Sequence, residues 1–106
     1  MPTFLLKSTY TAEGFAGLIR DGGTKRAEVV RALVENGGGE MTSIHFAFGA
    51  EDTYVLCDLP DHQAAAALAV AVGAAGGLRV QVVPLLSPDE VDEAVKMAPG
   101  YAPPGR

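Results

Sequence analysis

The order in which strand-like and helix-like runs follow one another most restricts what this chain can fold into. Runs of alternating apolar, β-branched and aromatic residues predict strands at Thr3–Tyr10, Met41–Phe48, Thr53–Leu59 and Leu78–Leu86. Apolar residues at helical spacing lie between the first two runs and between the last two. The order β-α-β-β-α-β predicts an α+β, ferredoxin-like fold, in which a four-stranded antiparallel sheet carries both helices on one face.

Glycine and capping residues indicate where the first helix lies. The four glycines of Thr11–Gly23 predict a long connection with at most one helical turn, at Ala12–Leu18. Thr24 is then the expected cap of the helix, which ends at the glycines Gly37–Gly39.

The later helices carry clearer signals. Asp61 is the expected cap of a helix that stops at Gly76-Gly77. Ser87–Glu90 forms a capping box with proline at the first helical position, which predicts an extra C-terminal helix. We expect residues 1–97 to form one domain and residues 98–106 to be an irregular tail rich in proline and glycine.

Composition excludes several classes of protein. The net charge of −5 and the lack of a basic stripe argue against a nucleic-acid partner. The longest apolar stretch, Ala64–Gly77, is too short to cross a bilayer, and no signal peptide is evident, so we expect a cytoplasmic protein without a membrane partner. Cys57 is the single cysteine, and its apolar surroundings predict a buried, structural thiol.

Alternation along the strands predicts what each face of the sheet carries. Wholly apolar sets, such as Val55, Cys57 and Leu59, are assigned to the helices, and mixed sets to the opposite, open face. The mixed sets contribute a candidate group of polar residues: Lys7, Tyr54, Asp58, Arg79 and Gln81. A face that mixes apolar area with converging polar groups suggests a ligand cleft or a dimer interface. In the second case these residues form interface pairs, such as Arg79 with Asp58.

The second helix gives an independent reason to expect assembly. From Ala64 to Val72 it contains only alanine, leucine and valine, so it has no charged, solvated face. A helix that is apolar all round is buried on more than one side, which a monomer of 106 residues can hardly provide. We therefore expect a homodimer or a higher homo-oligomer.

Other candidate sites have weaker patterns. His45 and Tyr54 are the candidate catalytic residues, as proton shuttles in a pocket, although a strand histidine is more often simply packed. No His, Cys and carboxylate set has ligand spacing, so we expect no metal, and no cofactor fingerprint is present. The Asp21–Arg26 segment has the backbone and cations to hold an anion, but a glycine turn followed by a capped helix is favoured.

Three ordered stretches carry a resemblance to a known family. They are "STYTAEGFAGLIRDGGTKRAE" (8–28), "FAFGAEDTYVLCDLPD" (46–61) and "VPLLSPDEVDEA" (83–94). The chain resembles the GYD domain family, whose members are mostly of unassigned function. The resemblance implies a ferredoxin-like protomer that pairs sheet against sheet into a dimeric α/β barrel. Gly49 and Asp52 match the family's Gly-Tyr-Asp signature, and Glu51 stands where the tyrosine is expected.

The resemblance leaves function open, because related barrels include cofactor-free monooxygenases, haem-degrading enzymes and simple ligand-binding proteins. We expect first a homo-oligomer that binds a small, partly apolar ligand in a cleft on the open face. A cofactor-independent monooxygenase-like or isomerase-like enzyme in that cleft is the second interpretation. A structural interaction module without a ligand is the third. The hairpin turn is expected to be a joint in which Asp52 bonds nearby N–H groups.

Overall fold

The computed structural model describes residues 1–105, in which strands and helices follow one another in the expected order. The elements are β1 (Thr3–Tyr10), α1 (Ala12–Asn36), β2 (Glu40–Phe46), β3 (Thr53–Asp58), α2 (His62–Ala75), β4 (Leu78–Leu85) and α3 (Pro88–Lys96). The strands form one antiparallel sheet in the order β2-β3-β1-β4. The α+β, ferredoxin-like fold with a four-stranded antiparallel sheet is therefore confirmed.

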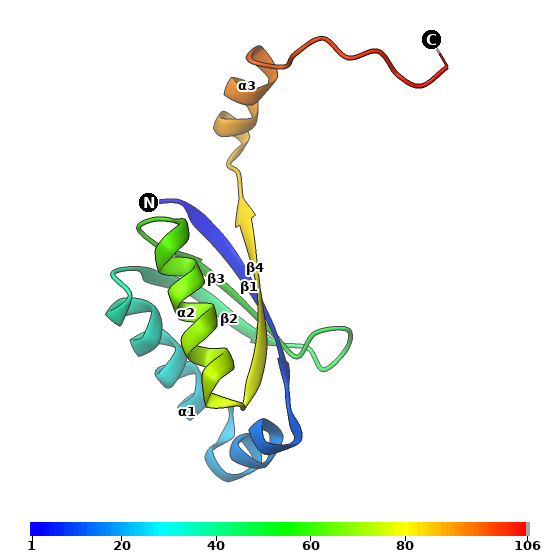
Figure 1. The fold of residues 1–106 in the computed structure, drawn as a ribbon. Coiled ribbons are helices and arrows are strands. Elements are labelled where there is room, and N and C mark those ends of the chain that lie inside the picture. The colour runs from blue at the N-terminus through cyan, green and yellow to red at the C-terminus, as the bar shows by residue number, and fades with distance from the viewer. Residues whose placement is uncertain (106) are drawn as a thin grey trace.

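The core lies between the sheet and the two long helices, which cover the same face (Figure 1). Phe4, Cys57 and Leu59 are buried there, as alternation predicted, and Val34 of α1 packs against them. Asp61 caps α2 by accepting a hydrogen bond from the N–H of Ala64 at 2.8 Å. These contacts leave the other face of the sheet without a helix.

The predicted start of the first helix was wrong. Helical structure begins at Ala12, not near Thr24, and is interrupted only at Gly22, whose φ is +80° and ψ 169°. The cap is Thr11, whose hydroxyl accepts a hydrogen bond from the N–H of Gly14 at 3.1 Å. Glycines suggested a connection because each costs helix stability, yet Gly14 is required here because α1 crosses the backbone of Gly77 closely.

Strand β2 is shorter and less regular than predicted. It ends at Phe46, because Phe48 adopts a positive φ of 56°. Its register with β3 shifts between Met41 and Ser43, so that a bulge precedes the last residues of the strand. His45 lies opposite Tyr54 after this bulge. This register places His45 on the open face, a question that the sequence left undecided.

The C-terminal part extends from the end of β4, away from the sheet (Figure 1). The capping box of α3 is present: Ser87 Oγ accepts from the N–H of Glu90, and the Glu90 carboxylate accepts from the N–H of Ser87. All side chains of α3 are exposed. Irregular backbone follows, and Arg106 of the predicted tail lies outside the described residues. None of the helices in residues 1–105 has the length and apolar character needed to cross a bilayer.

Candidate functional site

The open face presents one polar and one apolar row across its strands. His45, Tyr54, Lys7 and Gln81 are consecutive register partners from β2 to β4 and form the polar row. The next row consists of Ser43, Leu56, Leu5 and Val83. The three apolar side chains of that row are only half-buried, because nothing within the described chain covers them. The face therefore offers apolar contact area beside hydrogen-bonding groups.

All five predicted ligand residues lie on this face, but they do not form one cluster. Lys7 is the register partner of both Tyr54 and Gln81, and Arg79 lies opposite the neighbouring Thr9. Asp58 lies at the other end of the sheet, where its Oδ1 accepts a hydrogen bond from Thr3 at 2.7 Å. Arg79 and Asp58 do not pair within one chain, because the length of β1 separates them, and the suggested interface pair between them stays a prediction.

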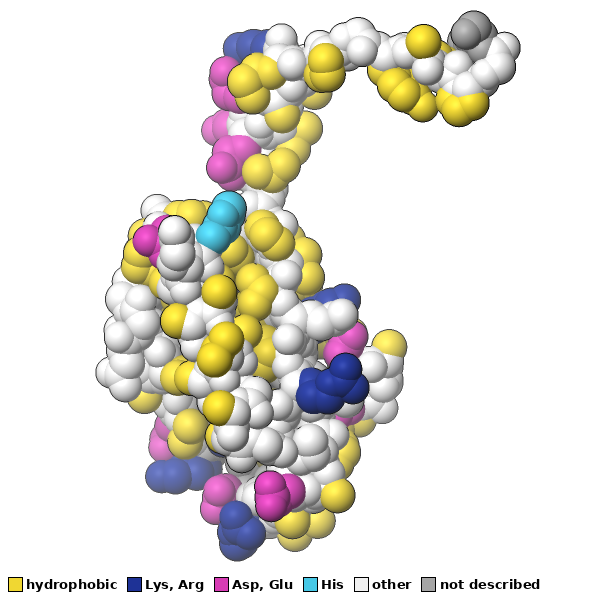
Figure 2. Space-filling model, viewed as in Figure 1, with side chains coloured by type: hydrophobic (Ala, Val, Ile, Leu, Met, Phe, Trp, Pro, Cys, Tyr) yellow, Lys and Arg dark blue, Asp and Glu magenta, His cyan; other side chains and the backbone are white. Residues whose placement is uncertain are grey.

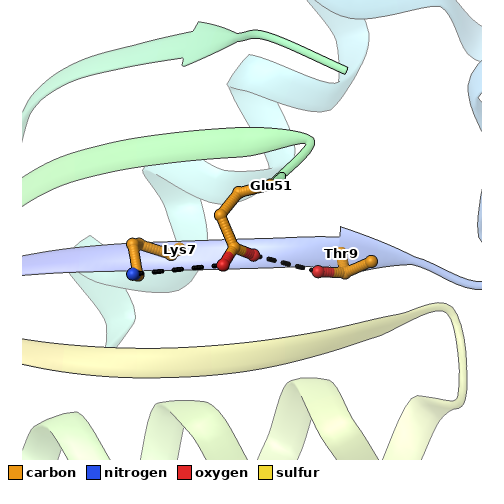
Figure 3. Close-up of polar contacts among 3 residues, drawn as sticks. All are labelled: Lys7, Thr9 and Glu51. Carbon is orange, nitrogen blue, oxygen red and sulfur yellow. Dashed lines mark hydrogen bonds and ion pairs between the residues drawn. The ribbon is translucent and has the colours of Figure 1, made fainter. Parts of the chain in front are cut away.

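The hairpin turn adds a residue that sequence reasoning had set aside. Glu51 reaches over β1, where its Oε2 accepts a hydrogen bond from the Thr9 hydroxyl at 3.0 Å (Figure 3). Its Oε1 lies 4.0 Å from Lys7 Nζ, an ion-pair distance too long for a hydrogen bond (Figure 3). A polar pocket of about 180 Å³ lies beside this contact, lined by Thr9, Ala50, Glu51, Arg79, Val80 and Gln81. The tip of the hairpin thus belongs to the open-face site.

Asp52 does not cap its own turn, contrary to expectation. Its Oδ2 accepts a hydrogen bond from the N–H of Tyr10 at 2.8 Å, and its own N–H donates to the carbonyl of Ser8 at 2.9 Å. Its carbonyl accepts from the N–H of Ala47 at 3.0 Å. Asp52 is buried and anchors the hairpin to the last residues of β1. The local sequence carries no signal for a bond that spans 42 residues.

A second polar cluster lies behind the sheet, on the helix side. Ser8, Tyr10 and Thr53 interrupt the otherwise apolar inward sets of β1 and β3, and the hydroxyls of Ser8 and Thr53 are hydrogen-bonded to each other. With Arg26 of α1 they line one end of a cavity of about 40 Å³. Burial raises the pKa of the Tyr10 hydroxyl above its usual 10.0, and the nearby Arg26 guanidinium opposes part of that shift.

This cluster was missed at the level of sequence, although a signal was present. Two polar residues, Ser8 and Tyr10, follow Phe4 and Leu6 on the inward side of β1. Arg26 was expected to be a solvated side chain, because it follows the cap expected at Thr24. Residues 1–105 contain no group of three or more His, Cys, Asp or Glu side chains that could hold a metal ion.

The strand order β2-β3-β1-β4, with two helices on one face, defines a ferredoxin-like α+β protein. The family model described as GYD domain matches residues 4–95, nearly all of the sheet and its helices. The chain belongs to the GYD domain family. Comparison with curated proteins and with solved structures gave no match.

Proposed function

We propose that this GYD domain protein is a homo-oligomer that binds a small, partly apolar molecule in a cleft on its open sheet face. The half-buried apolar row formed by Leu5, Leu56 and Val83 carries the proposal, because one chain leaves it uncovered. Covering this face with a second sheet removes apolar area from water, which is the usual driving force for association. We place the protein in the cytoplasm, and its charge of −5 argues against a nucleic-acid partner.

The ligand contacts that we propose lie around the polar row. Lys7, Tyr54 and Gln81 are neighbours in register, and Arg79 lines the adjacent pocket with Glu51. Lys7 keeps donors for a ligand, because its ion pair with Glu51 is long. Asp58 lies at the far end of the face, so it contacts only a ligand that extends along the strands or the second protomer.

An enzyme is the second candidate, and one observation favours it. His45 and Tyr54 are direct register partners, so their imidazole and phenol side chains leave neighbouring strands on the same, open face. Such a pair has the groups needed to move a proton in a cofactor-independent monooxygenase-like or isomerase-like reaction. A structural module whose open face is filled by its partner alone is the third candidate.

Native mass spectrometry of gently purified protein tests these proposals. An assembly that retains the mass of a small molecule supports the cleft, and an assembly of bare protein favours the structural module. A strictly monomeric protein at micromolar concentration contradicts the proposal. Replacing both Lys7 and Tyr54, as in K7M/Y54F, should release a molecule bound on the open face. For the enzyme, turnover that survives the replacement of both His45 and Tyr54 excludes the mechanism given above.

A further inference from the structure

Arg26 has no ion-pair partner among residues 1–105 although part of it is buried, and the neutral Tyr10 hydroxyl is the polar group beside its guanidinium. Its Nε is shielded from solvent and has no hydrogen-bond acceptor, and it is the one buried side-chain nitrogen or oxygen of this kind among residues 1–105. Neither of the ion pairs formed by these residues involves Arg26. A buried donor on a cation without an acceptor is unfavourable, so its presence needs a reason.

Arg26 borders two spaces, and only one of them contains hydroxyl groups. On the sheet side lies the small cavity that it shares with the hydroxyls of Ser8, Tyr10 and Thr53. On the outer side, Arg26 borders a groove of about 330 Å³ between α1 and α2, whose walls include Val29, Leu33, Ala71, Val72 and Ala75. Arg26 therefore lies between a small cavity, whose mainly apolar lining includes three hydroxyl groups, and an apolar groove.

The groove continues along the two helices beyond the reach of Arg26. Leu33 and Ala71 also line a neighbouring groove of about 310 Å³, together with Asn36, Gly37, Ala64, Ala67 and Leu68. The small alanine side chains of α2 keep this passage open, since larger residues would fill it. Together the two grooves form an open, mainly apolar channel along the helices, with one cation at its end.

We propose that this channel binds an amphipathic monoanion, a medium-chain alkyl carboxylate. Its carboxylate lies against the Arg26 guanidinium, which supplies the N–H donors that such a group accepts. The Tyr10 hydroxyl, which lines the cavity beside Arg26, is the second donor at this end. The alkyl chain lies between α1 and α2 against Leu33 and Ala71. This site is separate from the proposed open-face cleft, because the sheet lies between them.

The probe for the test is sodium decanoate, titrated below its micelle concentration into the full chain by isothermal titration calorimetry. We expect saturable binding of one decanoate per chain. Arg26→Met keeps the apolar stem and removes the charge, so its dissociation constant for decanoate should be at least roughly tenfold higher than that of the parent. The control is Arg20→Met, which removes the same charge from an exposed position of the same helix and should bind as the parent does. Decanol, which has no charge, should not distinguish the parent from Arg26→Met.

Folding of the variants separates a binding role from a structural one. If Arg26 serves a ligand, Arg26→Met without decanoate unfolds at the same temperature as the parent or higher, because an unpartnered donor is lost. If Arg26→Met does not fold, Arg26→Lys provides the second test and should bind decanoate with intermediate affinity. Equal decanoate binding by Arg26→Met and the parent overturns the proposal, as does an equal loss in Arg20→Met. Absence of saturable binding to the parent also overturns it.

Discussion

At the scale of single residues, the Asp52 carboxylate joins the hairpin to the end of β1. It is buried and accepts the N–H of Tyr10 at 2.8 Å. Asp52→Ala leaves that N–H without an acceptor, so we expect the free energy of unfolding to fall by ~2–3 kcal/mol. Denaturant titration at a fixed protein concentration measures this loss of unfolding free energy. Asp21→Ala, at an exposed aspartate, is the control. A loss no larger than that of the control contradicts the anchoring role.

Cys57 gives a pH-dependent prediction at the same scale. Burial, with a smaller contribution from Asp58, raises the pKa of its thiol from 9.0 to about 11. The unfolded chain loses this proton at a lower pH than the folded chain does. The stability linked to the thiol is therefore complete below pH 9 and is lost as pH rises toward 11. We expect the unfolding free energy of Cys57→Ala, although lower overall, to fall less steeply in this window. Parallel pH profiles for the two proteins would argue against it.

At the scale of elements, the start of α1 packs on the turn between α2 and β4. The N–H of Thr11 donates to the Gly77 carbonyl at 3.0 Å, and a Cβ on Gly14 would stand 1.9 Å from the same oxygen. Gly14→Ala should therefore cost ~1–3 kcal/mol of unfolding free energy. Gly17→Ala is the matched control, because its Cβ would meet only the end of the Arg20 side chain, at 3.6 Å. It should stabilise α1 by up to ~1 kcal/mol. Equal thermal shifts for the two variants would contradict this packing.

The strands and α1 show which features of the fold could be predicted from the sequence and which could not. Alternation placed Phe4 and Cys57 inside and Lys7 and Tyr54 on the open face, because side-chain direction in a strand depends only on local geometry. The start of α1 was misplaced because a glycine in a helix is explained only by its distant neighbour, here Gly77. The site behind the sheet was missed for a similar reason. Its Arg26 was expected to be solvated in the first turn of a helix, and it meets the residues of β1 only in the folded chain.

At the scale of the whole molecule, the open face should decide whether the chain associates. Leu56 lies in the middle of that face between Leu5 and Ser43. A carboxylate at this position cannot be buried between two sheets without a partner, so Leu56→Glu should convert the assembly into monomers. Light scattering after size-exclusion chromatography measures the mass, with Thr24→Glu as a control of equal charge on an exposed segment. An unchanged mass for Leu56→Glu would place the interface elsewhere.

The C-terminal arm, residues 86–105, is the second feature of the whole molecule that points to assembly. In Figure 2, apolar side chains lie on one side of α3 and acidic side chains on the other. The apolar residues of α3 include Val91 and Val95, whose side chains are 44% and 68% exposed. The body of the chain has an apolar groove beside α2 and β4, of about 420 Å³, lined by Phe4, His62, Ala65, Ala66, Ala69, Val70, Val82 and Pro84. The apolar side of α3 in one copy could therefore pack into the apolar groove beside α2 and β4 of a second copy.

We therefore expect the arm to contribute to association in the proposed homo-oligomer. Ending the chain after Leu86, or replacing Val91 and Val95 by glutamine, should shift dissociation to a higher protein concentration, because the apolar contacts of α3 are lost. The matched control replaces Asp92 and Lys96 by asparagine and glutamine on the charged side of the same helix. Sedimentation velocity over a concentration series measures the shift. If the Val91 and Val95 variant dissociates as the control does, α3 lies outside the interface and the open face alone must hold the copies together.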